Sequence, residues 1–145
     1  MNITLLCIAL AVFSEARGEP ELGRIAVAQV VLNRMEYRDL GACEVLLEKG
    51  QFSFNPAQYF DKPTKGSGLK PNLVVSRLPT HKKGWGRSVL AAEIALKQQN
   101  RMGGIEFFHA TYVNPQWGAR FVRVFSVGGH VFYARKTGIY ARKPA

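Results

Sequence analysis

The stretch Ser14-Glu15-Ala16-Arg17-Gly18-Glu19-Pro20 joins two apolar segments and decides how the first part of the chain folds. Residues 3–13 before it carry no charge, so a helix there is expected to be buried on most faces, with Glu15 at its C-terminal end. Burial and the negative end of a helix dipole both raise the pKa of a carboxyl group, as a general acid requires. A nearby cation such as Arg17 acts in the opposite sense. The residues alone leave both readings open, a catalytic acid or an ion pair of Glu15 with Arg17.

A second helix is expected to follow directly. Gly18 suits the left-handed turn that ends a helix, and Glu19-Pro20-Glu21 is typical of a helix start. The helix should cover about residues 20–35, with apolar residues at helical spacing on one side and more on a second side. This pattern predicts a central helix. Asn33 and Arg34 near its end are either solvated or supports for a cleft.

The rest of the chain predicts shorter elements. A helix is expected at about residues 43–49, and another at 85–100 with Trp85, Val89, Ala92 and Leu96 on one face. Residues 105–110 are typical of a strand. The runs 121–127 and 130–135 flank a diglycine, which is a strong hairpin signal. The expected fold class is therefore α+β, mainly helical, with a small antiparallel hairpin lobe.

Residues 55–86 differ in composition from the rest, because four of the seven prolines lie there together with many lysines and arginines. A loop of this length inside a compact domain tends to be functional. It is either a basic lobe that borders a cleft and holds an anionic glycan, or a solvated loop. The basic tail at about residues 135–145 is suited to anionic envelope lipids or is disordered.

The composition and net charge limit the kinds of partner that the chain can bind. The chain has 145 residues and a net charge of +10, so we expect one domain over residues 1–145 with an anionic partner. Nucleic acid, peptidoglycan and anionic lipids all meet that description. Cys7 lies inside the apolar run, where a free buried thiol is common, which favours reduced cysteines and synthesis in the cytoplasm. Residues 5–13 resemble the core of a signal peptide, but no Lys or Arg precedes them, so a core helix is expected.

The histidines do not predict a metal site. His81, His109 and His130 show no metal-ligand spacing, so neither a metal nor another cofactor is expected. His109 and His130 are read as hydrogen-bonding residues near the cleft or in the sheet. Tyr112 and Trp117 are read as sugar-stacking residues or as cover for the core. Gln51 and Ser53 can bind sugar groups in a cleft, although Ser53 can equally cap a polar turn.

Four blocks of the sequence resemble the SleB-type cell wall hydrolases, a family that includes spore cortex-lytic enzymes. The blocks are residues 14–35 (SEARGEPELGRIAVAQVVLNRM), Gly50-Gln51-Phe52-Ser53, Phe108-His109-Ala110 with Pro115-Gln116-Trp117, and Gly129-His130-Val131-Phe132-Tyr133. The resemblance implies a fold like that of goose-type lysozyme and lytic transglycosylases. It also implies that Glu15 is the catalytic acid. We expect substrate contacts from Gln51, Ser53, His109, Tyr112, Trp117 and His130.

The resemblance implies lytic transglycosylase activity on peptidoglycan glycan strands, with 1,6-anhydro-muramic acid ends as product. A hydrolytic muramidase is the alternative enzyme, and a basic nucleic-acid-binding or wall-binding module is the alternative without catalysis. Nucleic acid is not the expected partner, because no recognition pattern for it is present. Small size and high basicity favour a monomeric phage endolysin that is made in the host cytoplasm without a cleaved signal peptide and acts on the cell wall.

Overall fold

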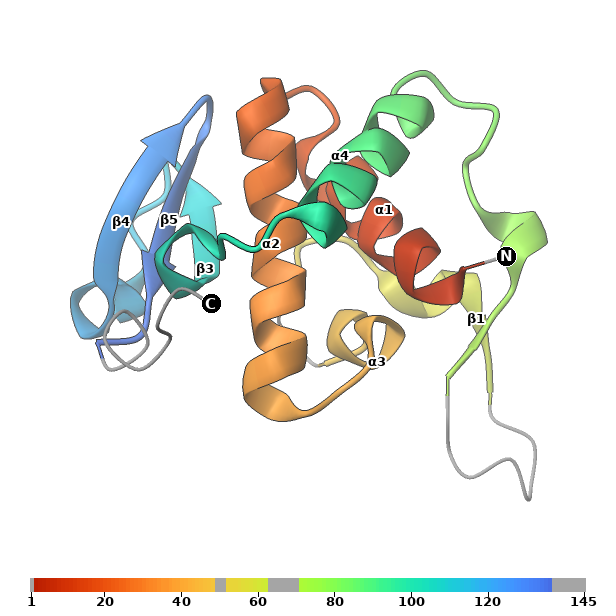
Figure 1. Cartoon of the computed structure of the whole chain (residues 1–145), viewed down its shortest axis with the longest axis horizontal. Helices are drawn as coiled ribbons and strands as arrows, with labels where there is room; N and C mark the ends of the chain where they lie inside the picture. Colours follow the sequence, from red (N-terminus) through yellow and green to blue (C-terminus); the bar gives the residue numbers. More distant parts are fainter. Residues whose placement is uncertain (1, 49–51, 63–70, 137–145) are drawn as a thin grey trace.

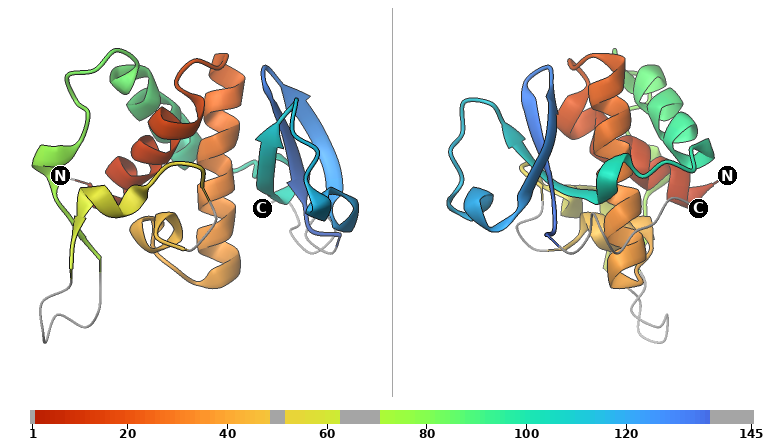
Figure 2. Two further views of the ribbon diagram at one scale, coloured as in Figure 1. Left: turned by 180° about the vertical axis from the view of Figure 1, so that it is seen from behind. Right: turned by 60° about the vertical axis from the view of Figure 1, so that its left-hand side comes forward.

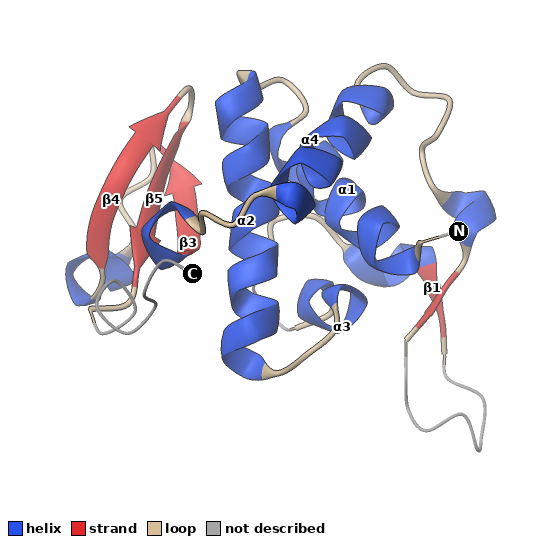
Figure 3. Cartoon of the chain, in the orientation of Figure 1, coloured by secondary structure: helices blue, strands red, loops and turns tan. Residues whose placement is uncertain are grey.

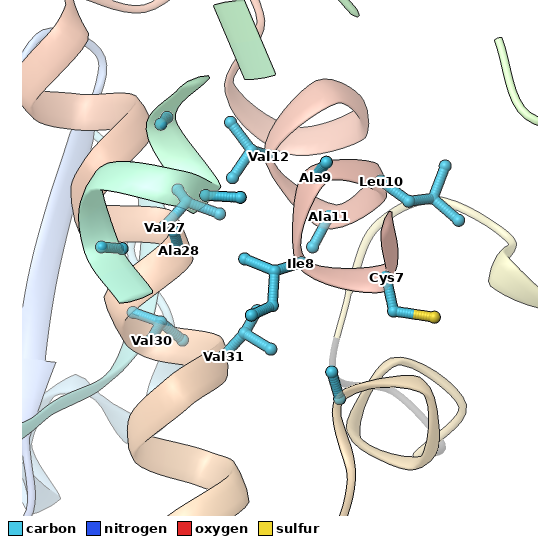
Figure 4. Close-up of a cluster of buried hydrophobic side chains, with 14 of the residues drawn as sticks. Cys7, Ile8, Ala9, Leu10, Ala11, Val12, Val27, Ala28, Val30 and Val31 are labelled. Atoms are coloured by element: carbon cyan, nitrogen blue, oxygen red, sulfur yellow. The ribbon is translucent and has the colours of Figure 1, made fainter. Parts of the chain in front are cut away.

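The first helix, α1 (Ile3–Ala16), forms the centre of the hydrophobic core. The structure is a computed structural model, and it describes residues 2–48, 52–62 and 71–136. Asn2 caps α1 by accepting a hydrogen bond from the backbone N–H of Leu5. Every residue from Cys7 to Phe13 is buried (Figure 4). The prediction of a helix buried on most faces, with Glu15 in its last turn, is confirmed.

The second helix, α2 (Glu21–Arg38), stands between the other helices and the larger sheet (Figure 1). Residues 23–34 of this helix are all buried, because α1 and α4 pack on one side and the sheet packs on the other. The prediction of a central helix is confirmed, although the helix continues three residues beyond Met35. It ends at Asp39, whose backbone is left-handed and whose N–H bonds to the carbonyl of Met35.

The short helix α3 (Ala42–Leu46) packs against α1 and corrects the prediction about the cysteines. Cys7 and Cys43 form a disulfide, with their Cα atoms 5.3 Å apart. The expectation of reduced thiols was wrong because it considered only the apolar surroundings of Cys7. The turn after α2 brings α3 back to the α1 side that carries Cys7, which a sequence separation of 36 residues does not reveal.

The helix α4 (Trp85–Lys97) packs on α1 and α2 through small residues. Its buried positions are Trp85, Ser88, Ala91, Ala92 and Ala95. Leu96, which was predicted to face the core, is 38% exposed. Trp85 and Ala92 of the predicted face are buried and Val89 packs against the core, so the prediction is confirmed in part. Small buried residues on the neighbouring side shift the packed face away from Leu96, because they allow a close helix approach. The helix also ends at Lys97 rather than at Asn100.

The larger sheet is antiparallel, with strand order β3-β5-β4, and forms a layer beside α2 (Figure 2). Its strands are β3 (Ile105–Ala110), β4 (Val122–Val127) and β5 (His130–Ala134). The predicted hairpin across Gly128-Gly129 is confirmed. The face toward the helices carries Phe108, Phe125 and Phe132, while Phe107, Trp117 and Phe121 pack together on the other face.

The region 55–86 contains short elements that were not predicted. A 3-10 turn (Pro56–Tyr59) leads into a two-stranded ribbon of β1 (Phe60–Asp61) and β2 (Asn72–Leu73), and a second 3-10 turn follows (Val75–Arg77). The segment 63–70 lies outside the described residues. The whole is α+β, mainly helical with small antiparallel sheets (Figure 3), which confirms the predicted fold class. In the described part of the chain, no helix is both long and apolar enough to cross a membrane.

Candidate functional site

The carboxylate of Glu15 is held by Ser53, which lies in the loop after α3. The backbone N–H of Ser53 donates to Oε1 of Glu15 at 2.7 Å. The hydroxyl of Ser53 lies 3.0 Å from Oε1 and 2.8 Å from Oε2. Glu15 itself is half-buried, while Ser53 is exposed. The first and second sequence blocks therefore meet at one carboxylate, and Ser53 fixes the direction in which it points.

Arg17 turns away from Glu15. Its guanidinium carbon lies 4.8 Å from the centre of the Phe13 ring, on the side of α1 that faces the start of α4. Across residues 2–48, 52–62 and 71–136, no ion pair joins Glu15 to Arg17. Of the two readings that the sequence left open for Glu15, the ion pair is not the one that the structure shows.

Glu19 connects the start of α2 to the tip of the β4–β5 hairpin. Its Oε1 accepts a hydrogen bond from the backbone N–H of Gly129 at 2.6 Å. The hairpin tip fits closely here, since a β-carbon on Gly128 would lie 2.3 Å from Oε1 of Glu19 and 2.7 Å from Cδ of Pro20. From the sequence, Glu19 was predicted only to be an acidic residue at a helix start. Nothing in the sequence connects it to a diglycine 110 residues away.

His130 follows this hairpin tip and lies on the sheet face toward the helices, with its ring 5.1 Å from that of Phe108. Burial lowers the pKa of His130 below its ordinary value, while the charges of Glu19 and Glu15 act to raise it. Both carboxylates are thus near enough to influence the imidazole. Among the predicted substrate-binding residues that the structure describes, Ser53 contacts Glu15 directly, and His130 lies where the charge of Glu15 acts on it.

Two surface hollows flank the end of α1. One, of about 440 Å³, is lined by Ser53 with residues of α3 and of the loop that follows it. The other, of about 510 Å³, is lined by Arg17, Gly18, Lys82, Lys83 and Arg87. Glu15 is linked to the first through Ser53 and precedes the lining of the second by two residues. Glu15 itself is not among the residues that line either hollow, but both linings include residues close to it in contact or in sequence.

Asn33 and Arg34 are buried, so they support the fold beside the site and are not solvated residues. The Nδ2 of Asn33 donates to the carbonyl of Ile105 at 2.8 Å, and Nε of Arg34 donates to that of Glu106 at 2.6 Å. The Arg34 guanidinium also lies 5.1 Å from the Phe52 ring, next to Ser53. Burial lowers the pKa of Arg34 to about 10. These contacts join α2 both to β3 and to the loop that holds Glu15.

His109 and Trp117 lie on the face of the sheet that points away from the helices. His109 Nε2 is 3.0 Å from the Tyr133 hydroxyl, and the rings of His109 and Trp117 are 5.7 Å apart. Tyr112 is 90% exposed in the loop that projects from the sheet after β3 (Figure 2). His109 points away from the helices because alternate residues of β3 point to opposite faces, and Phe108 points toward the core. In the described part of the structure, no hydrogen bond links Glu15 to His109, Tyr112 or Trp117.

Gln51, the remaining predicted substrate-binding residue, lies outside the described residues. Within the described residues, no group of three His, Cys, Asp or Glu side chains is arranged to hold a metal ion. The chemistry that the described site offers is therefore that of a positioned carboxylate with an imidazole and a hydroxyl close by.

Comparison with known proteins gives a family and a fold. Two solved structures are similar to this chain. The catalytic domain of the Bacillus cereus SleB protein is 24% identical, with a TM-score of 0.61, covering 90% of this chain and 88% of that chain. The catalytic domain of the germination-specific lytic transglycosylase SleB from Bacillus anthracis is 23% identical, with a TM-score of 0.62, covering 92% of this chain and 96% of that chain. At this level of identity the likeness shows a shared fold, which is the lysozyme-like fold that the resemblance implied.

No curated protein matches the chain. The cell wall hydrolase family matches residues 18–133, which begin three residues after Glu15 and include the Glu19, Ser53 and His130 positions described above. The match covers well over half of the chain. The protein therefore belongs to the cell wall hydrolase family.

Proposed function

We propose that this protein cleaves the glycan backbone of peptidoglycan between N-acetylmuramic acid and N-acetylglucosamine, with Glu15 as the single acid and base. Its family makes it an enzyme that degrades peptidoglycan. The observation that carries the finer proposal is the hydrogen bonding of Ser53 to Glu15, with donors at 2.7 Å and 2.8 Å from the two carboxylate oxygens. A carboxylate held by hydrogen bonds at the end of a buried helix has the preorganisation that proton transfer requires.

The reaction proceeds in two proton transfers. The carboxyl proton of Glu15 moves to the glycosidic oxygen as the bond from that oxygen to C1 of muramic acid breaks, and N-acetylglucosamine leaves as an alcohol. The resulting carboxylate then removes the proton of the 6-hydroxyl of the same muramic acid while that oxygen bonds to C1. The product is a 1,6-anhydro ring, and Glu15 is protonated again.

This route needs no second carboxylate, whereas glycoside hydrolysis ordinarily uses two. Glu19 is close enough to influence the same histidine as Glu15, but its Oε1 accepts from the Gly129 backbone at the hairpin tip. Glu93 is exposed on α4. The Bacillus anthracis protein of similar fold is itself a lytic transglycosylase. These observations favour the transglycosylase over a hydrolytic muramidase.

The supporting residues have different roles in this proposal. Ser53 acts as a positioning residue, because its donors already bind Glu15 in the free protein. His130 is half-buried beside the two carboxylates, and we assign it a hydrogen bond to the bound sugar. Tyr112, Trp117 and His109 stay predicted contacts for more distant sugars of the strand, and so does Gln51.

The proposed place of action is outside the cytoplasm, where peptidoglycan lies. The Cys7–Cys43 disulfide supports this, since such bonds persist in oxidising compartments. Binding of anionic lipids by the basic tail remains a proposal, since residues 137–145 lie outside the described part of the chain. A monomeric state and a phage origin likewise remain predictions.

Digestion of defined peptidoglycan in oxygen-18-labelled water tests the proposed reaction. The soluble fragments are analysed by mass spectrometry without prior reduction. The proposal predicts anhydro ends, one water lighter than reducing ends, and no incorporated label. Reducing muramic acid ends that carry the label would instead identify a hydrolytic muramidase.

A further inference from the structure

The hollow of about 510 Å³ beside the end of α1 is lined almost entirely by cations, namely Arg17, Lys82, Lys83 and Arg87 with Gly18. All ten Asp and Glu residues of the chain lie within the described residues. None of them forms an ion pair with these four cations in the described part of the structure. The hollow is therefore a concentration of positive charge that no Asp or Glu side chain neutralises in the part of the chain that the structure describes.

The chain folds in a way that forces these cations together. A β-carbon placed on Gly84 would lie 3.5 Å from Cβ of Arg17 and 4.0 Å from Nη2 of Arg87, so the two arginines converge on this glycine. Gly84 has a left-handed backbone, with φ +96°, and forms the turn that brings Lys82 and Lys83 to the same place. Like charges gathered around one hollow repel each other, and an anion bound between them offsets that repulsion.

The start of α4 adds to the positive potential. The first turn of the helix contains Arg87 and no acidic residue, and no side chain caps it. Backbone N–H groups at a helix N-terminus carry partial positive charge and favour anions, so cations at this end are unfavourable in the free protein. These cations therefore destabilise the free protein, and a bound anion would offset that destabilisation.

The chemistry of the proposed substrate points to the anion that this hollow binds. Glu15 and Arg17 belong to the same helix end, but Glu15 faces Ser53 whereas Arg17 faces Gly84 and Phe13. The peptide stem of peptidoglycan starts on the lactyl group of the muramic acid whose C1–oxygen bond is broken. An extended chain of three residues reaches about 10 Å, and the peptide stem carries free carboxylates along that length.

We propose that this cationic hollow, made by Arg17, Lys82, Lys83 and Arg87, binds the carboxylates of the peptide stem and so positions the muramic acid for cleavage at Glu15. The inference rests on the proposed action on peptidoglycan. It assigns the basic segment before α4 the role of a stem-binding lobe, and it predicts that cleavage depends on the charge of the peptide as well as on the glycan.

A titration followed by nuclear magnetic resonance tests binding separately from catalysis. The probe is N-acetyl-L-alanyl-γ-D-glutamyl-L-lysine, compared with the same peptide in which both carboxylates are amides. We expect backbone amide shifts at residues 82–87 with the first peptide, and binding at least about tenfold weaker with the second, since charge-assisted hydrogen bonds are lost. Equal binding of the two peptides, or no shift at these residues at millimolar concentration, overturns the proposal. Binding of inorganic phosphate without binding of the peptide also overturns it, in favour of a phosphate-bearing polymer or lipid.

The double variant Lys82→Met with Arg87→Met provides the matched change, because it leaves Arg17 and its contact with Phe13 intact. The control is Lys97→Met with Arg123→Met, which removes the same charge from exposed positions outside the hollow. The first variant should bind the peptide about tenfold more weakly and unfold at the same or a higher temperature, because it relieves the repulsion at the start of α4. Unchanged binding in the first variant, or the same loss in the control, contradicts a specific site.

Digestion of cell walls separates this inference from the proposed function. Native walls are compared with walls whose carboxylates have been converted to amides by carbodiimide and ammonia. The wild type should lose activity on amidated walls, and the Lys82→Met, Arg87→Met variant should be slow on both. A wild type that binds the peptide but cleaves neither wall overturns the proposed function alone. A variant that matches the wild type on native walls overturns the stem-binding site alone.

Discussion

At the scale of single residues, Ser53 is the most informative position, because it holds both oxygens of the proposed catalytic carboxylate. Changing Ser53 to alanine removes the hydroxyl contacts and leaves only the backbone donor. We expect the rate of wall digestion to fall about tenfold, as is typical when a charge-assisted hydrogen bond is lost, with little change in stability because the side chain is exposed.

Ser53→Thr serves as the matched variant for this prediction, because it keeps a hydroxyl at the same place. It should recover most of the activity that Ser53→Ala loses. Full activity in the alanine variant, or equal loss in both, would show that the hydroxyl does not position Glu15.

The lowered pKa of His130 makes stability depend on pH. The unfolded chain binds a proton at this histidine near its ordinary pKa of about 6.5, whereas the folded protein binds it only at lower pH. Between those two values the unfolded state holds more protons, so the free energy of unfolding decreases as the pH falls below about 6.5.

His130→Gln should therefore flatten this dependence when urea unfolding is measured between pH 5 and pH 7.5, a range of about one unit or more on each side of 6.5. His81→Gln, at an exposed position in the loop before α4, is the control and should leave the slope unchanged. An undiminished slope in the His130 variant would contradict the burial of its imidazole.

At the scale of elements, the disulfide ties α3 to α1. A bridge across a sequence separation of 36 residues is expected to stabilise the fold by about 2–4 kcal/mol. The double variant Cys7→Ala with Cys43→Ala should have a free energy of unfolding that is lower by that amount, and it should therefore unfold at a lower urea concentration. Reductant should have no further effect on this variant. A wild type whose unfolding is the same with and without reductant would contradict the bridge.

The contact between Glu19 and the hairpin tip joins α2 to the sheet, and the two glycines of the tip test it. Gly128 has φ +54°, and a methyl group there would meet Glu19 Oε1 at 2.3 Å, whereas the corresponding distance at Gly129 is 3.3 Å to Oε2. Gly128→Ala should lower the free energy of unfolding by more than the about 1–2 kcal/mol that a left-handed backbone costs, because the methyl group also clashes with Glu19. It should also reduce activity by displacing His130.

Gly129→Ala is the matched change and should have the smaller effect on both thermal unfolding and digestion rate. If the two variants behaved alike, the close fit of Gly128 against Glu19 would not be what holds the hairpin in place.

Elements were predictable where local chemistry determines them. The uncharged run of α1 and the diglycine between β4 and β5 each have one stable solution, so type and position were both found. The packed face of α4 was predicted only in part, because it depends on how closely the small residues of this helix allow α1 and α2 to approach. The β1–β2 ribbon was missed because two-residue strands carry no periodic pattern.

At the scale of the whole molecule, the site is made by contacts between distant segments. Glu15 was found from its place at the end of an apolar helix and from a resemblance. Its partner Ser53 lies 38 residues away, and Glu19 meets a glycine 110 residues away. Such pairings depend on the arrangement of the elements, which is also why one set of aromatic and histidine candidates divides between the two faces of the sheet.

The central claim is that one carboxyl group performs the proton transfers, and the most direct test compares two substitutions that each replace a carboxyl group by an amide. Glu15→Gln keeps the size of the side chain, while Glu21→Gln neutralises an exposed acid in the first turn of α2. With purified walls as substrate, the account predicts that Glu15→Gln lowers the digestion rate at least about 100-fold with unchanged thermal unfolding, and that Glu21→Gln keeps the wild-type rate. A folded Glu15→Gln protein that digests walls at the wild-type rate would contradict the account.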